Sequence, residues 1–157
     1  RKIIDTLRSR CIQFKLAINN NDKIKIINLL TEDNFFYQIN KDFVNYYNSP
    51  SDYINYYFFC VNNNIDFQKL NIENFLHFII NGAHYKKNNY IKDNLSNYLE
   101  LFFSKKIKFF HFKKNIYKLY NYFTFKMHNV KKYNLDLDSF LLEFNAFPGN
   151  LLFQLES

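Results

Sequence analysis

Arg8, Ser9, Arg10 and Cys11 are the residues whose types and order best suit chemistry on phosphate groups. The chain has 18 lysines but only three arginines, and all three arginines lie within its first ten positions. An arginine side chain is a planar fork that stays ionised and binds two phosphate oxygens together, whereas lysine is a flexible point charge. Arginines kept in so lysine-rich a chain therefore indicate a phosphate contact. The alternative is a pair of surface charges near one end of the sequence.

The composition limits the classes of protein to consider. The chain has 157 residues, 48% of them hydrophobic and 22% charged, which fits one or two small domains. Two Gly and two Pro exclude collagen-like and Pro/Gly-rich disordered chains. The two cysteines, Cys11 and Cys60, stand 49 positions apart, so they form neither a CxxC zinc pair nor a disulfide framework. We expect both to be buried thiols.

The sequence carries no recognisable membrane or export signal. No apolar run reaches the roughly 18 residues of a membrane-spanning helix, and no signal-peptide pattern is present. We therefore expect a cytoplasmic protein. Because the sequence begins with Arg1 in an apolar run and not with Met, we also expect it to be a fragment that lacks its natural N-terminal part.

Charge is unevenly distributed along the chain. Residues 1–30 have seven basic and two acidic groups, residues 31–80 have two and six, residues 81–132 have twelve and two, and residues 133–157 have none and four. Such blocks predict separate surfaces for different partners. In the most basic block lysines interleave with Phe and Tyr, a pattern that single-stranded nucleic-acid binders use. We favour the competing interpretation, a solvated helix face in a protein encoded by AT-rich DNA.

The hydrophobic pattern predicts a mainly helical chain. Residues 11–16 alternate apolar and polar side chains, which indicates one short strand. After the break at Asn19-Asn20-Asn21, Asp22 is suited to cap a helix that runs through Ile27 to Leu30.

Five further helices are predicted from periodic apolar residues between capping and breaking residues. They cover about 51–61, from Pro50 to the Asn62-Asn63-Asn64 run; a segment from Asn71 to Gly82; residues 89–103; residues 112–132, as the longest; and a last helix from Asp138 to Pro148-Gly149. From about residue 65 onward this pattern is typical of an all-α bundle.

The segment from Ile4 to Cys11, just before the predicted strand, resembles the Ser-Arg-Cys motif of clamp-loader subunits in the AAA+ family. The nearest match in style is the delta-prime branch of that family in bacterial DNA polymerase III. The resemblance implies that Arg10 is an arginine finger that reaches ATP bound by a neighbouring subunit. Fingers supplied in trans contribute about 10³–10⁵ in rate in other systems, because a fixed cation stabilises the charge that develops on the phosphate. Ser9 and Cys11 would set its position at a strand edge, with Arg8 as a second cation.

A second match lies at Asn48-Ser49-Pro50-Ser51-Asp52-Tyr53-Ile54. This segment resembles the sensor-2 segment of the same family, in which ATP-hydrolysing subunits carry Gly-Ser-x-Arg-Asp-Ala-Leu. Ser49 and Asp52 match that pattern, whereas Ser51 stands where the nucleotide-contacting Arg would be. A neutral hydroxyl cannot neutralise a triphosphate, so the resemblance implies a degenerate sensor 2 and a subunit that does not hydrolyse ATP at its own site.

A third match concerns layout. Residues 123–144 resemble the end of the family's collar domain, where a long helix, an Asn-Leu-Asp turn (here Asn134-Leu135-Asp136) and a final helix follow one another. The resemblance implies three units. Residues 1–18 would be the tail of an AAA+ α/β ATPase-like domain, residues 19–62 a small helical lid domain, and residues 63–157 the all-α collar that holds subunits together.

For function, the resemblance implies a subunit of the bacterial clamp loader, which helps place the sliding clamp on primed DNA during replication. Its partners would be the other subunits of a hetero-pentamer, the sliding clamp and primed DNA. It would need no cofactor of its own, because ATP is bound by the neighbouring subunit, and it would be a non-hydrolysing component of the polymerase holoenzyme. Two alternatives stay open: a stand-alone basic helical protein that binds nucleic acid through residues 86–132, and a motor-type subunit with a degenerate sensor.

The four histidines do not predict a metal site. His77 and His84 stand seven positions apart and could share a helix face only if Gly82 does not end that helix. No cluster of Cys or carboxylate residues completes a ligand set around them or around His111 and His128. We predict structural or surface roles for all four.

Overall fold

The computed structural model describes residues 18–31, 34–45, 48–109 and 113–154. Within these ranges the chain forms helices and no strand, so the prediction of a mainly helical protein is confirmed there. The predicted strand over residues 11–16 and the predicted finger group Arg8, Ser9, Arg10 and Cys11 lie outside the described residues.

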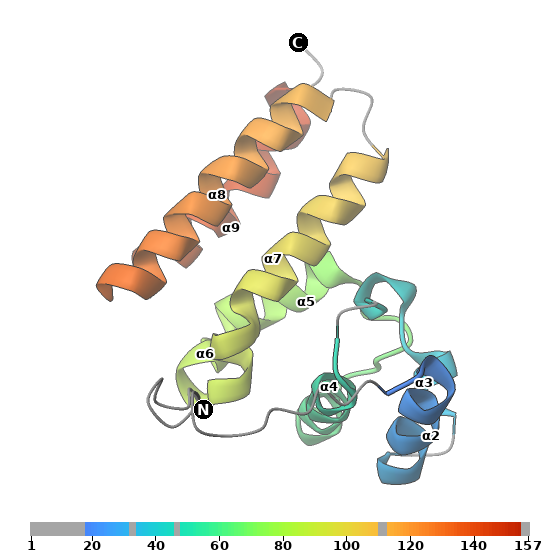
Figure 1. Cartoon of the computed structure of the whole chain (residues 1–157). Helices are drawn as coiled ribbons and strands as arrows, with labels where there is room; N and C mark the ends of the chain where they lie inside the picture. Colours follow the sequence, from blue (N-terminus) through green and yellow to red (C-terminus); the bar gives the residue numbers. More distant parts are fainter. Residues whose placement is uncertain (1–17, 32–33, 46–47, 110–112, 155–157) are drawn as a thin grey trace, which may run out of the picture.

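Two groups of helices are joined by a short middle section (Figure 1). The first group comprises α2 (Asn20–Leu30), α3 (Phe35–Gln38) and α4 (Pro50–Asn62). The second comprises the long helices α7 (Asn89–Phe109) and α8 (Lys113–Tyr133), which run side by side, and α9 (Leu137–Gln154), which packs on α8. Between the groups lie the 3-10 helix η1 (Lys41–Phe43), α5 (Ile72–Asn81) and α6 (His84–Lys87).

Local capping signals account for most helix starts. Pro50 is the first residue of α4, as predicted, and Asn71 caps α5 by accepting a hydrogen bond from the Asn74 amide at 2.8 Å. The prediction that Asp22 caps the first helix is wrong. Asn19 is the cap, and its side-chain oxygen accepts from the Asp22 amide at 2.8 Å, because it precedes the helix in extended backbone.

The start of the last helix is corrected in the same way. Asp136, and not Asp138, satisfies the free amides of the first turn of α9. Its carboxylate accepts from the amide of Asp138 at 3.1 Å and from that of Ser139 at 3.2 Å.

The observed helix ends agree less well with the sequence-based predictions than the helix starts do. The Asn62-Asn63-Asn64 run ends α4, with Asn64 in the left-handed region at a φ of 53°. Gly82 ends α5 as predicted, but its φ is −81°, and the left-handed residue is Ala83 at 49°. The predicted stop at Pro148-Gly149 is wrong, because α9 continues to Gln154. Proline removes one amide donor, which disfavours a helix interior but does not by itself end a helix.

Helix length is also corrected in one respect. The helix that begins at Lys113 has 21 residues, but so does α7, which is longer than the predicted 89–103.

One apolar core connects all the major helices, and aromatic rings form much of it. Phe75 of α5 meets Phe43 of η1 at 5.3 Å between ring centroids, Tyr56 of α4 at 5.5 Å and Tyr98 of α7 at 4.8 Å. Rings in such edge-on contacts gain about 0.5–1.5 kcal/mol per pair beyond simple burial. The predicted boundary between residues 62 and 63 therefore runs through packed side chains, and it stays a prediction.

The structure also bears on the predictions about buried cysteines and about membrane-spanning helices. Cys60 is a free thiol with 0% of its surface exposed, as expected, whereas Cys11 lies outside the described residues. Across the described ranges, no helix combines the length and the apolar character needed to cross a bilayer.

Candidate functional site

The first turn of α4 is the part of the predicted site that the structure describes. It holds Ser49, Ser51 and Asp52, the three residues of the predicted degenerate sensor 2. The Asp52 carboxylate accepts from the Ser49 amide at 2.7 Å and from the Ser49 hydroxyl at 2.7 Å. The hydroxyls of Ser49 and Ser51 lie 2.8 Å apart. These polar groups therefore satisfy one another, and the charge that they present at the helix start is negative.

The loop before α4 is held by side chains from three elements. The Tyr53 hydroxyl accepts from the Asn45 amide and donates to the Asn45 carbonyl, both at 3.0 Å. Asn97 of α7 donates to the side-chain oxygen of Asn48 at 3.2 Å. Burial raises the pKa of Tyr53, so its hydroxyl keeps its proton at neutral pH.

Two more side chains, from α2 and α7, fix this loop and helix start. The Lys23 ammonium of α2 donates to the Asn48 carbonyl and lies 5.4 Å from the centroid of the Tyr53 ring. Tyr90 of α7 donates its hydroxyl proton to the Asp52 carbonyl at 2.7 Å. The polar groups of this loop and of the α4 start therefore form bonds within the protein. These bonds hold α2, α4 and α7 together.

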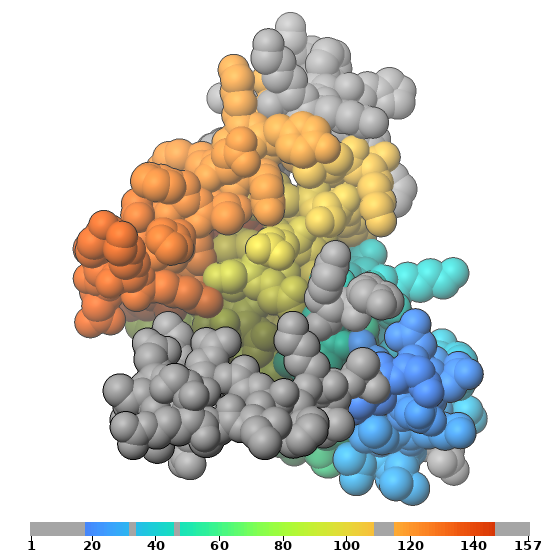
Figure 2. All heavy atoms as spheres, viewed as in Figure 1, coloured from blue at the N-terminus to red at the C-terminus, as the bar shows by residue number. Residues whose placement is uncertain are grey.

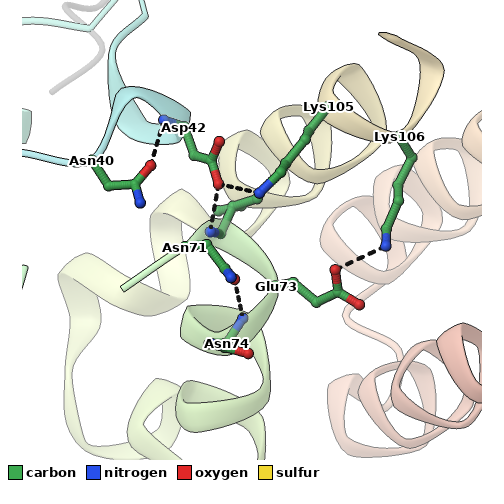
Figure 3. Close-up of polar contacts among 8 residues, drawn as sticks. Asn40, Asp42, Asn71, Glu73, Asn74, Lys105 and Lys106 are labelled. Carbon is green, nitrogen blue, oxygen red and sulfur yellow. Dashed lines mark hydrogen bonds and ion pairs between the residues drawn. The ribbon is translucent and has the colours of Figure 1, made fainter. Parts of the chain in front are cut away.

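A polar junction that the sequence did not reveal ties η1 to α5 and α7 (Figure 3). The Asp42 carboxylate accepts from the Lys105 ammonium at 2.6 Å and from the Ile72 amide at 3.1 Å. Asp42 thereby forms an ion pair with Lys105 of α7. It also accepts a hydrogen bond from an amide in the first turn of α5 that has no partner within that helix. Next to it, the Lys106 ammonium contacts the Glu73 carboxylate at 2.8 Å.

The lysine-rich stretch is therefore not uniform. Lys105 and Lys106 face carboxylates of η1 and α5, and their side chains are 28% and 23% exposed. Lys126 of α8 contacts Glu143 of α9, and Lys86 of α6 contacts Asp138. The prediction of a simple solvated face holds for only part of the stretch, because these four lysines join helices to one another.

Two tyrosine hydroxyls near the α4 start are buried and have only weak polar contacts, with the Cys60 thiol and the Tyr90 hydroxyl, in the described part of the chain. They belong to Tyr56 and Tyr98, which line one small cavity of about 10 Å³ together with Tyr90 and Asn97. Burial raises the pKa of Tyr90 to about 12 and that of Tyr98 well above its ordinary value. All three hydroxyls therefore stay neutral at physiological pH.

A larger cavity of about 700 Å³ lies beside the turn between α8 and α9. The turn is the predicted Asn134-Leu135-Asp136, with Asn134 left-handed at a φ of 51°. The Tyr85 hydroxyl donates to Asp138 at 2.9 Å, and burial, aided by this carboxylate, raises the pKa of Tyr85 to about 12. Lysines and aspartates both line the cavity, so its charge favours neither an anion nor a cation.

The histidines within the described ranges act in packing or lie at the surface, and His111 falls outside those ranges. Gly82 ends the helix that carries His77, so His77 and His84 share no helix. The His84 ring stacks on Phe78 at 4.5 Å between centroids, and desolvation lowers the pKa of His84. Among the described residues no three His, Cys, Asp or Glu side chains gather as a metal site would require.

The function suggested by the sequence has no support from relatives. Comparisons of the chain with protein-family models, curated proteins and solved structures find no match.

Proposed function

We propose that this chain is a delta-prime-like subunit of a bacterial clamp loader, which helps place a ring-shaped sliding clamp on primed DNA. The observation that carries the proposal is the order Arg8-Ser9-Arg10-Cys11, with two of the three arginines of a lysine-rich chain flanking one serine. In this proposal residues 1–18 end the ATPase-like domain, residues 19–62 form the lid and residues 63–157 form the collar.

Two features of the described residues support the proposal. The described residues from Asn20 onward form helices and no strand, and α8 and α9 form a hairpin of two long helices around the Asn134-Leu135-Asp136 turn, the layout expected of a collar. The first turn of α4 offers the carboxylate of Asp52 and the hydroxyls of Ser49 and Ser51, and no guanidinium. A start of this kind suits a subunit that leaves ATP hydrolysis to its neighbours.

The proposed mechanism uses Arg10 in trans. Its guanidinium enters the nucleotide site of the adjacent subunit and stabilises the charge on the γ-phosphate as the bond to the leaving group breaks. Arg8 adds positive charge, and Ser9 and Cys11 fix the backbone. The subunit itself transfers no group and holds no nucleotide, so it acts as a fixed wall against which the ATP-hydrolysing neighbour closes.

The test is the full-length subunit with Arg10→Ala in a reconstituted loader. We expect DNA-stimulated ATP hydrolysis at the neighbouring site to fall by about 10³-fold or more, the loss typical of a missing finger. Arg10→Lys should recover little of this rate, because lysine lacks the planar fork.

Arg8→Ala is the matched control, since it removes the same charge two positions away. We expect a much smaller loss for it than for Arg10→Ala. Equal ATPase and clamp-loading rates for wild type and Arg10→Ala, in loaders of the same subunit composition, would overturn the assignment.

A further inference from the structure

α8 has the charge of a polyanion-binding helix. Its 21 residues include six lysines and no acidic residue. Two of these lysines are engaged elsewhere, because Lys126 contacts Glu143 of α9 and Lys131 donates to the Asp93 carbonyl of α7 at 3.1 Å. Lys118 and Lys132, by contrast, are exposed and have no acidic partner within the described ranges.

The outward face of α8 follows from helical spacing. Ile116, Phe123 and Met127 are buried against the rest of the bundle. The opposite side carries Lys118, Asn121, Phe125, His128 and Lys132, which are three or four positions apart and all exposed. At 1.5 Å per residue, Lys118 and Lys132 lie about 21 Å apart along the helix axis. Figure 2 shows α8 along one edge of the molecule, open to solvent.

Aromatic rings stand among these lysines. Phe125 is 68% exposed and Tyr117, on the same side, is 49% exposed. The Lys132 ammonium lies 5.1 Å from the centroid of the Tyr133 ring, which is 60% exposed. The flat faces of these rings and the spacing of Lys118 and Lys132 suit a ligand that carries both rings and regularly spaced negative charge.

We propose that the outward face of α8 binds single-stranded nucleic acid, with Lys118 and Lys132 on phosphates and Phe125 stacked on a base. Charge complementarity argues for a polyanion, because α8 contributes lysines and no acidic residue to this face. The exposed ring argues for single strands over duplex, since only unpaired bases offer their faces for stacking. This site uses neither Arg10 nor the α4 start, so it stands or falls separately from the clamp-loader assignment.

The test is fluorescence anisotropy of a labelled oligo(dT) titrated with the chain over a range of salt concentrations. Each phosphate contact on a single strand adds about 0.7 to the slope of log Kobs against log salt. The double variant Lys118→Gln/Lys132→Gln should therefore lower the magnitude of that slope by about 1.4. Phe125→Ala should weaken binding about 5-fold or more at every salt concentration, because one stacked base is lost.

Matched controls lie on the other side of the molecule. Lys25→Gln/Lys69→Gln removes two exposed lysines that neighbour Asp22 and Asp66, and Tyr37→Ala removes a ring that is 70% exposed on α3. We expect both controls to bind like wild type. Three results would each overturn the proposal: no binding by the wild-type chain, equal losses in the α8 variants and their controls, or competition by polyglutamate as strong as that by unlabelled oligo(dT).

Discussion

Two sets of lysines from one basic stretch have opposite surroundings in this protein. At the junction of η1, α5 and α7, Lys105 and Lys106 each meet a carboxylate and are mostly buried. On the outward face of α8, Lys118 and Lys132 are exposed among aromatic rings. The sequence gives no sign of this division, because all four lysines occur in similar contexts of Phe, Tyr and Asn.

The comparison shows that partners, and not residue type, decide what a charged group can do. A lysine whose mostly buried ammonium pairs with a carboxylate, as in Lys105 and Lys106, joins two elements and is less available to phosphate groups. An exposed lysine without such a partner contributes little to stability and can bind a polyanion. The start of α4 belongs to the first kind, since Ser49, Ser51 and Asp52 bond to one another.

The largest effect on stability is expected from Asp42→Ala. This change removes the Lys105 contact and the acceptor of the Ile72 amide together, so we expect a loss of about 2–3 kcal/mol in the free energy of unfolding. Urea denaturation followed by circular dichroism measures it. Lys118→Ala, on the outward face of α8, should change that free energy by less than about 0.5 kcal/mol. Similar losses in the two variants would remove the distinction between the two sets of lysines.

A smaller effect separates two tyrosines at the seam between α4 and α7. Tyr53→Phe loses both hydrogen bonds to Asn45, so we expect a loss of about 1–2 kcal/mol in the free energy of unfolding. Tyr98→Phe removes a buried hydroxyl whose contact with the Tyr90 hydroxyl is too poorly aligned for a normal hydrogen bond, so stability should stay the same or rise slightly. A clear loss in Tyr98→Phe, measured by the same urea titration, would mean that its hydroxyl makes a bond in solution.

Local signals predicted the elements well and long-range contacts poorly. Pro50 and Asn71 mark helix starts through preferences of their own backbone or side chain, so they could be read from the sequence. Gly82 follows the last residue of α5, but its φ of −81° is open to any residue, and the left-handed turn at Ala83 was not predicted. Asn19 and Asp136 were missed in favour of the aspartates that follow them, because several neighbouring residues can supply a cap and only the backbone selects one. The contact of Asp42 with Lys105 joins residues 63 positions apart, and no periodic pattern in the sequence predicts such a pair.

The central claim is that this chain is a clamp-loader subunit. Reconstitution of the complex with the other loader subunits tests that claim most directly. The chain is mixed with the ATP-hydrolysing and remaining loader subunits of the same organism, and the complex is weighed by native mass spectrometry. The account predicts one copy of this chain in a hetero-pentamer, because the collar helices from α5 to α9 would join neighbouring subunits. A chain that stays monomeric in that mixture, or that associates only with itself, would contradict the account.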